Sequence, residues 1–328
     1  MQKIIKKFSH LKIHTQYSIC EGTIKIDDLK EYCKKNQIQS IGISDSTNLC
    51  GALEFSESIS KSGTQPIIGT QINFKYNDNI GLLPLVALNE NGYKRIIELS
   101  SKYYLENNDL SELSLSINTL LEKPDGIAIF SGTSFGFFGK LFDKGKLEDI
   151  DKIYQKIHSV FKDKFYIEIQ RHNDLNEKNF EQFNLELSHK FDIPLIATQE
   201  VFYLDKTMHE AHDALICIGN KTYINEKNRI KYSNQHYFKT DQEMNDLFSD
   251  LPEALENNKN FPYLVNFKPQ ASEPVLPDIS TNEGKKADES LINESNQGLI
   301  LKFKKIFNMP EKNLNNDKKY LNYKKSLD

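Results

Sequence analysis

The amino-acid sequence predicts an α/β fold in which parallel strands, each followed by a helix, close into a distorted (β/α) barrel. Short runs of apolar and β-branched residues recur along the first 200 residues, as expected for buried strands. Segments with helical spacing separate these runs, so strands and helices alternate. With roughly seven such units in about 220 residues, a closed barrel is favoured over an open sheet.

Local patterns place the individual elements. After a first strand that ends near residue 14, strands are predicted at residues 39–46, 65–74, 82–88, 126–132, 165–170 and 193–201. Helices are predicted at residues 91–103, 147–161, 176–191 and 207–218. In a (β/α) barrel the functional site lies at the carboxyl ends of the strands. The residues that directly follow each strand are therefore the candidates for function.

Bulk properties exclude several classes of protein. The net charge of −4 does not favour binding of polyanions by the whole molecule. No apolar run reaches the length of a membrane span, so no membrane contact is expected. The four cysteines are scattered and form no C-x-x-C pair, which is typical of a protein from a reducing cytoplasm.

The stretch HLKIHTQYSICEGT, residues 10–23, resembles a metal-binding motif that lacks one ligand. Alternate residues of a strand point to the same side, so Lys12 and His14 occupy the positions of an H-x-H pair. A protonated lysine cannot bind a cation. The open question is whether the chain still performs metal chemistry.

Several further blocks occur together with this motif and in a fixed order. They are GISDSTNLCGALEF, QPIIGTQINF, NENGYKRIIELSSK, FYIEIQRHN and PLIATQEVFYLDKTMHEAHDALICIGNKT. In this order and spacing the sequence resembles the PHP (polymerase and histidinol phosphatase) domain found at the N-terminus of bacterial DNA polymerase III alpha subunits, the C-family replicative polymerases. The resemblance extends over roughly residues 8–310 and implies a PHP-type distorted barrel.

The same resemblance identifies the positions of a metal site and shows departures from it. Family members that bind metal have histidine, glutamate or cysteine ligands where this chain has Lys12, Ser46, Gln71, Thr133 and Phe202, and an apolar residue near Leu82 replaces a further histidine. The candidate ligands that remain are His14, Asp45, His172, Glu200 and Glu21. A cluster of divalent metals needs many deprotonated donors. We therefore expect a vestigial site without Zn or Mn, in which the Lys12 ammonium pairs with Asp45 or Glu200.

The resemblance also implies a domain organisation. Residues 1–268 correspond to the PHP domain, residues 269–282 to a linker that contains proline and serine, and residues 283–328 to the incomplete helical start of the polymerase palm region. The carboxylates that hold two metal ions in a polymerase palm have no counterpart in these 328 residues. The chain alone is therefore expected to be inactive as a polymerase.

Three functions are compatible with these patterns. In the first, the full-length protein is a DNA-directed DNA polymerase, a nucleotidyltransferase that uses Mg²⁺, contacts DNA and the sliding clamp, and replicates DNA. Its PHP domain would then be a structural and docking module for the proofreading exonuclease subunit. The alternatives are a metal-dependent 3′–5′ exonuclease, which the lost ligands oppose, and a stand-alone phosphoesterase resembling histidinol phosphatase. The polymerase-like sequence after Phe267 opposes that third function.

Overall fold

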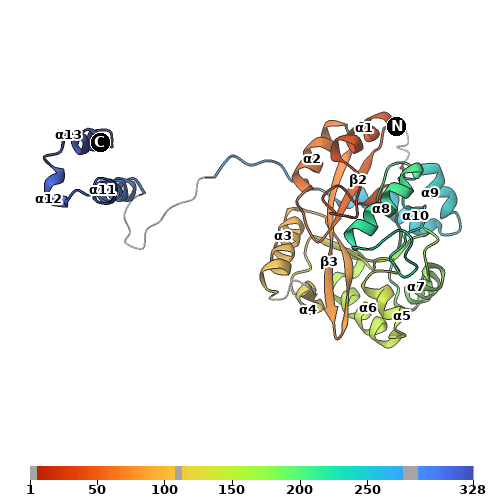
Figure 1. Ribbon diagram of the computed structural model, residues 1–328. Coiled ribbons are helices and arrows are strands. Elements are labelled where there is room, and N and C mark those ends of the chain that lie inside the picture. Colours follow the sequence, from red (N-terminus) through yellow and green to blue (C-terminus); the bar gives the residue numbers. More distant parts are fainter. Residues whose placement is uncertain (1–5, 108–112, 276–286, 328) are drawn as a thin grey trace. The chain divides into compact units, whose positions relative to one another are not determined.

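The computed structural model describes residues 6–107, 113–275 and 287–327. The chain divides into two units, Met1–Ala271 and Ser272–Asp328 (Figure 1). The part of the expected linker from residue 276 onward, and the first residues of the expected palm segment, lie outside the described residues.

The larger unit is built on one sheet. Its strands are β1 (His10–Ile13), β2 (Ser40–Ser46), β3 (Gln65–Tyr76), β4 (Asn79–Ala87), β5 (Leu115–Ser116), β6 (Ile127–Phe130), β7 (Phe165–Ile169), β8 (Leu195–Ala197) and β9 (Glu200–Val201). Their order is β8-β7-β6-β4-β3-β2-β1-β9, and β5 pairs with β3. Each apolar run predicted as a strand forms one, except that the run at residues 193–201 divides into the two short strands β8 and β9.

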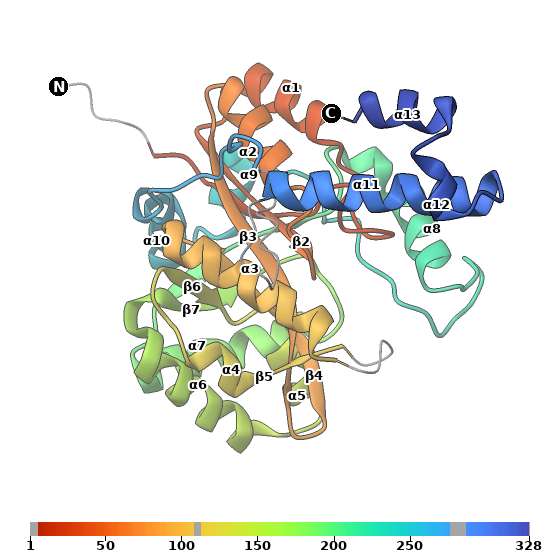
Figure 2. The ribbon, with the colours of Figure 1, turned by 90° about the vertical axis from the view of Figure 1, so that its left-hand side faces the viewer.

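The helices surround this sheet (Figures 1 and 2). They are α1 (Ile26–Asn36), α2 (Ala52–Lys61), α3 (Glu90–Leu105), α4 (Ile117–Leu121), α5 (Phe137–Asp143), α6 (Leu147–Phe161), α7 (Glu177–Phe191), α8 (His209–Gly219), α9 (Asp241–Leu247) and α10 (Pro252–Asn260). The smaller unit contains α11 (Ala287–Ile306), α12 (Glu311–Leu314) and α13 (Lys318–Lys325). No helix in the described ranges is long and apolar enough to span a lipid bilayer.

The two ends of the sheet are consecutive segments of chain. Strands β8 and β9 stand at opposite ends of the strand order, yet only Thr198 and Gln199 separate them. The ends must therefore lie next to each other, and the sheet curves into the predicted distorted barrel. Most pairings are parallel as expected, but β4 is antiparallel to both β3 and β6. The cause is a tight turn at Asn77, whose φ of 51° lies in the left-handed region.

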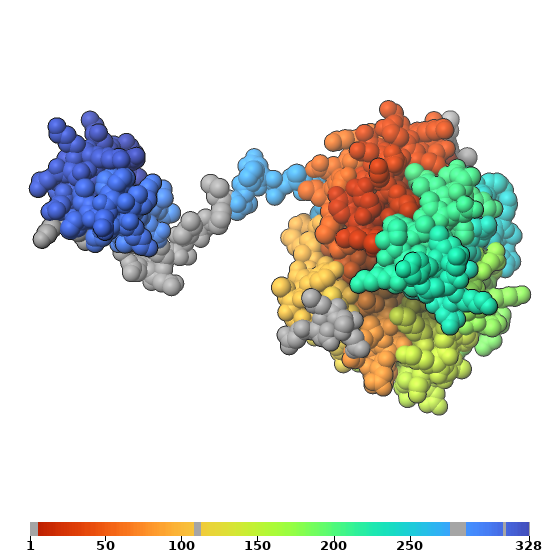
Figure 3. All heavy atoms as spheres, viewed as in Figure 1, coloured from red at the N-terminus to blue at the C-terminus, as the bar shows by residue number. Residues whose placement is uncertain are grey.

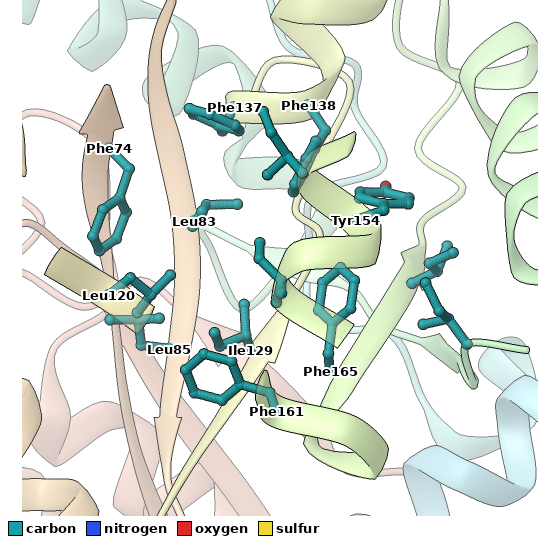
Figure 4. Close-up of a cluster of buried hydrophobic side chains, with 14 of the residues drawn as sticks. Phe74, Leu83, Leu85, Leu120, Ile129, Phe137, Phe138, Tyr154, Phe161 and Phe165 are labelled. Atoms are coloured by element: carbon teal, nitrogen blue, oxygen red, sulfur yellow. The ribbon is translucent and has the colours of Figure 1, made fainter. Parts of the chain in front are cut away.

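Alternation along the strands separates the two sides of the sheet. On β6 and β7, Ile129, Phe165 and Ile167 pack outward in a large apolar cluster with helices α3, α5 and α6. Figure 4 shows Ile129 and Phe165 with side chains of α5 and α6 from this cluster. Phe130 and Tyr166, which alternate with them, belong to a separate buried cluster that Phe261 also joins. This second side faces the barrel interior. The inward positions of β1, β7 and β9 that lie outside its apolar cluster carry polar side chains.

Helix ends are determined by local sequence. Helix α6 buries residues spaced three and four apart, from Ile150 to Phe161, and matches the predicted range of 147–161. The Asn89 side chain caps α3 by accepting from the amide of Gly92. Position 92 requires glycine, because a Cβ there would lie 1.7 Å from the carbonyl oxygen of Gly126. These contacts hold the outer helices on the strands and thereby position the strand ends.

Candidate functional site

The interior of the barrel contains a buried ammonium group between two buried carboxylates. The Nζ atom of Lys12 lies 3.0 Å from a carboxylate oxygen of Glu200 and 3.2 Å from one of Glu168. The three side chains are at most 7% exposed. Burial alone would lower the pKa of Lys12, but the two carboxylates raise it above its ordinary value. Lys12 is therefore charged and paired on both sides.

The three residues come from strands that are distant in the sheet. Lys12 lies on β1, Glu168 on β7 and Glu200 on β9. Strands β1 and β7 are not neighbours in the strand order, so the contact between Lys12 and Glu168 crosses the barrel interior. On β7, Glu168 alternates with the apolar residues Ile167 and Ile169, which places its carboxylate inward.

Further donors complete the surroundings of Glu168. Its carboxylate accepts hydrogen bonds from the amide of Gly132, at 3.0 Å, from the side-chain amide of Gln170, at 2.8 Å, and from the Thr198 hydroxyl. These donors come from the ends of three different strands. They stabilise a charge that would otherwise be costly to bury.

Glu200 receives a second set of donors. The Nε2 atom of His14 lies 2.6 Å from Oε1 of Glu200, and the side-chain amide of Gln71 donates to the same oxygen. A carboxylate can only accept, so His14 carries a proton on Nε2. Burial would raise the pKa of Glu200, but Lys12 and His14 hold it well below its usual range.

Asp45 lies at the mouth but does not pair with Lys12. Its two oxygens accept from the backbone amide of Thr15, at 2.6 Å, the Thr15 hydroxyl, at 2.7 Å, and the Ser18 hydroxyl, at 2.7 Å. Burial nevertheless raises the pKa of Asp45, against these hydrogen bonds. Of the two carboxylates expected to pair with Lys12, Glu200 does so. Asp45 instead binds to the loop that follows β1.

Two further expected positions bond to each other. The Ser46 hydroxyl donates to the carboxylate of Glu21 at 2.5 Å. Both residues line a cavity of about 970 Å³ at the mouth of the barrel, which Thr133 and Phe202 also line. Phe202 stacks on His212 with ring centroids 5.1 Å apart. At this position, where family members that bind metal have a histidine ligand, the chain therefore makes an aromatic contact.

His172 lies in a group of titratable residues that the sequence did not indicate. Its ring stacks on that of His236, with centroids 4.0 Å apart and an interplanar angle of 3°. His172 Nδ1 lies 3.1 Å from Glu177, and its Nε2 accepts from the amide of Glu200. Burial, together with the nearby His236, lowers the pKa of His172 well below its usual range. His236 Nε2 in turn lies 2.7 Å from Asp174.

The potential ligand atoms of His172, Asp174 and His236 all lie within 4.8 Å of one another, which makes this group the first candidate for a metal centre. The lone pairs of the two imidazoles, however, lie in nearly parallel planes, so both rings cannot direct them at a shared ion. Each ring nitrogen also has a partner within the protein. The arrangement of this group therefore does not fit a divalent metal.

The remaining expected ligands lead to the same result. His14 Nε2 faces Glu200, and both oxygens of Asp45 are occupied by hydrogen bonds. The Lys12 ammonium occupies the space between the two buried carboxylates that would bind a cation. Glu168 was missed in the sequence, although an acidic residue within the apolar run FYIEI is a signal for an inward polar position.

Removal of the Lys12 charge should destabilise the protein. In Lys12→Ala or Lys12→Met, two buried carboxylates lose their cation, and we expect the free energy of unfolding to fall by about 3–5 kcal/mol. Urea unfolding followed by circular dichroism measures this loss. Lys178→Ala, at an exposed position on α7, serves as the control. A Lys12→Met protein within about 1 kcal/mol of the parent would contradict a stabilising role of the ammonium.

Stability should fall when the pH is lowered from 6.5 toward 4. Burial lowers the pKa of both His10 and His212 from 6.5 to about 4, so the folded state favours their neutral forms. Their contribution to the free energy of unfolding is fully present above pH 6.5 and is lost as the pH falls toward 4. The loss is on the order of 2–3 kcal/mol for each histidine. Urea unfolding across this range measures the loss. A His212→Gln protein should show a flatter profile, and an equally steep one would be inconsistent with this origin.

The chain is similar to known proteins over most of its length. A family model described as PHP domain matches residues 10–172. The DNA polymerase III subunit alpha of Caulobacter vibrioides is 32% identical over 308 residues, which cover 90% of this chain and 26% of that protein. The corresponding subunit of Vibrio cholerae is 29% identical over 309 residues, covering 93% and 27%. The chain thus spans about a quarter of the length of these curated relatives.

Among solved structures, a two-domain protein from Bacteroides vulgatus that contains a predicted PHP-like metal-dependent phosphoesterase matches with a TM-score of 0.36 and 13% identity, covering 77% of this chain and 63% of that one. The family match over residues 10–172 and the alignments over about nine-tenths of the chain identify the family. The chain carries a PHP domain and is similar, over about nine-tenths of its length, to bacterial DNA polymerase III alpha subunits.

Proposed function

We propose that this chain is the N-terminal segment of a replicative DNA polymerase and that its PHP barrel is a structural and docking module with a degenerate metal site. The observation that carries the proposal is the Lys12 ammonium, which lies between Glu168 and Glu200 in the barrel interior. An ammonium supplies the positive charge of a cation but offers no open coordination position.

Hydrolysis of a phosphodiester at this site would need metal-bound water and a metal to stabilise the leaving oxygen. Lys12 cannot lower the pKa of a water molecule by coordination, and the side chains of His14 and Glu200 are bonded to each other. These contacts support loss of nuclease and phosphoesterase activity in this barrel. They also explain why polar residues remain buried there, since they stabilise one another.

Polymerase activity belongs, in this proposal, to the full-length protein. The chain covers about a quarter of the length of the relatives, and the palm carboxylates that bind Mg²⁺ would lie in the part that the chain does not cover. Contacts with DNA and with the sliding clamp would also be made through the full-length protein. The 328 residues alone are proposed to be inactive as a polymerase.

The proofreading exonuclease subunit is the proposed partner of the barrel itself. A polymerase with a silent PHP domain needs its 3′–5′ exonuclease from another chain. The mouth of the barrel keeps a cavity of about 970 Å³, which lies among loops that catalysis no longer constrains. A docking role would account for an intact barrel that lacks the metal chemistry.

Metal retention tests the degenerate site. The purified chain is exposed to Zn²⁺ and Mn²⁺, passed through gel filtration and analysed for metal content. We expect far less than one ion per chain, because the Lys12 ammonium repels a cation. Lys12→Ala is the matched variant. It removes the ammonium from the space between Glu168 and Glu200, so its metal content shows whether the ammonium keeps the ion out. A stoichiometric ion in the parent that His14→Ala or His172→Ala removes would refute the degenerate site.

A nuclease assay separates the alternatives. The chain with Mn²⁺ is incubated with 3′-labelled single-stranded DNA and, separately, with a phosphomonoester. We expect neither substrate to be hydrolysed above the rate of the buffer. Release of 3′ nucleotides that Glu200→Gln abolishes would instead support a metal-dependent exonuclease.

A further inference from the structure

The loop after α8 has an unusual surface. Between residues 220 and 235 it exposes Tyr223, Ile224 and Ile230, of which each side chain is at least 50% exposed. Figure 3 shows this segment, in turquoise, lying on the surface between the N-terminal part of the chain and the yellow-green region of α5 and α6. Apolar side chains exposed together on one loop are typical of an interaction site.

A nearly buried arginine holds this loop in place. The Arg229 guanidinium forms two hydrogen bonds of 2.6 Å with the Asp213 carboxylate on α8. It also donates to the carbonyl oxygens of Ile224 and Ile230, each at 3.2 Å. The Arg229 side chain is only 2% exposed. The loop is thus organised before any partner arrives, which lowers the entropic cost of binding.

Other loops extend the same surface. Ile230 lines the 970 Å³ cavity together with Phe135, from the loop after β6, and Leu175, from the loop after β7. Both of these side chains are exposed, and the Phe135 ring contacts that of Tyr232 at 5.9 Å between centroids. The apolar surface therefore continues from the loop into the mouth of the barrel.

The net charge of the loop of residues 221–232 is positive, because its exposed lysines outnumber its one exposed carboxylate, that of Glu226. Lys221, Lys227 and Lys231 are exposed and form no ion pair within the described part of the chain, and two of them line the cavity. The acidic residues of the cavity, by contrast, are engaged by the protein, as Asp174 is by His236 and Glu200 by Lys12. A complementary partner must supply carboxylates next to apolar side chains.

We propose that the loop of residues 221–232, with Phe135 and Leu175, is a docking surface for a protein segment in which apolar side chains alternate with carboxylates. This inference rests on the docking role proposed above and assigns its location. A second copy of the chain is a poor occupant, because a two-fold contact would place these lysines against themselves. The cavity is also at the upper end of the sizes that enclose a single small ligand.

The test uses the full 328-residue chain and the proofreading exonuclease subunit from the same organism, with binding measured by calorimetry at two salt concentrations. Ile224→Asp/Ile230→Asp should weaken binding at least about tenfold, because it places acidic groups opposite the partner's carboxylates. Lys227→Glu/Lys231→Glu should weaken binding and reduce its salt dependence. Leu105→Asp, at an exposed apolar position on α3, should leave the affinity unchanged.

The outcomes separate this inference from the proposed function. Binding that persists unchanged in both double variants overturns the assigned surface and leaves the docking role standing. No binding by the parent chain overturns the docking role itself. Thermal unfolding of each variant verifies that it folds, and a folded Ile224→Asp/Ile230→Asp protein with weakened binding supports the surface. If Leu105→Asp also lost affinity, the effect would be a general one of added negative charge, and this would count against the assigned surface.

Discussion

The ion pairs of Lys12 with Glu168 and Glu200 join strands β1, β7 and β9 through the barrel interior. Any one of these charges would be costly to bury alone, and the group is stable only while all three are present. The donors around them, such as Gln170 on the Glu168 carboxylate, depend on the same geometry. The closed barrel and its polar interior are thus mutually dependent: the strands position the charges, and the charges hold distant strands together.

In the proposed function an ammonium takes the place of a metal ion, and this has a consequence for the chemistry of the site. A divalent ion can polarise a phosphate and activate water, whereas a lysine paired on both sides can only hold carboxylates in place. The proposed roles follow from this difference. The interior maintains the shape of the barrel, and the loops at its mouth, such as the one that Arg229 anchors to Asp213, are available for contacts with a partner. In the proposed function the buried ion pairs therefore contribute to stability and to the shape of the docking loops, and not to catalysis.

Local patterns were sufficient for much of the fold. The apolar runs predicted the strands, and the spacing in residues 147–161 predicted α6 with the observed bounds. The direction of β4 was not evident, because an antiparallel hairpin and a parallel crossover can follow equally apolar strands, and the turn at Asn77 decides between them. Similarly, His209 begins α8 two residues later than predicted because a short 3₁₀ turn precedes it.

The sequence alone determined the barrel class, the departures from a metal-binding pattern, and the need for a partner to the Lys12 charge, because these depend on residue type and on spacing along one strand. Only the tertiary structure decided which carboxylates serve that charge. Glu168 lies 156 residues from Lys12 and meets it across the barrel, while Asp45, the other expected partner, is held by Thr15 and Ser18. Electrostatic pairing depends on distance in space, and closure of the sheet sets that distance.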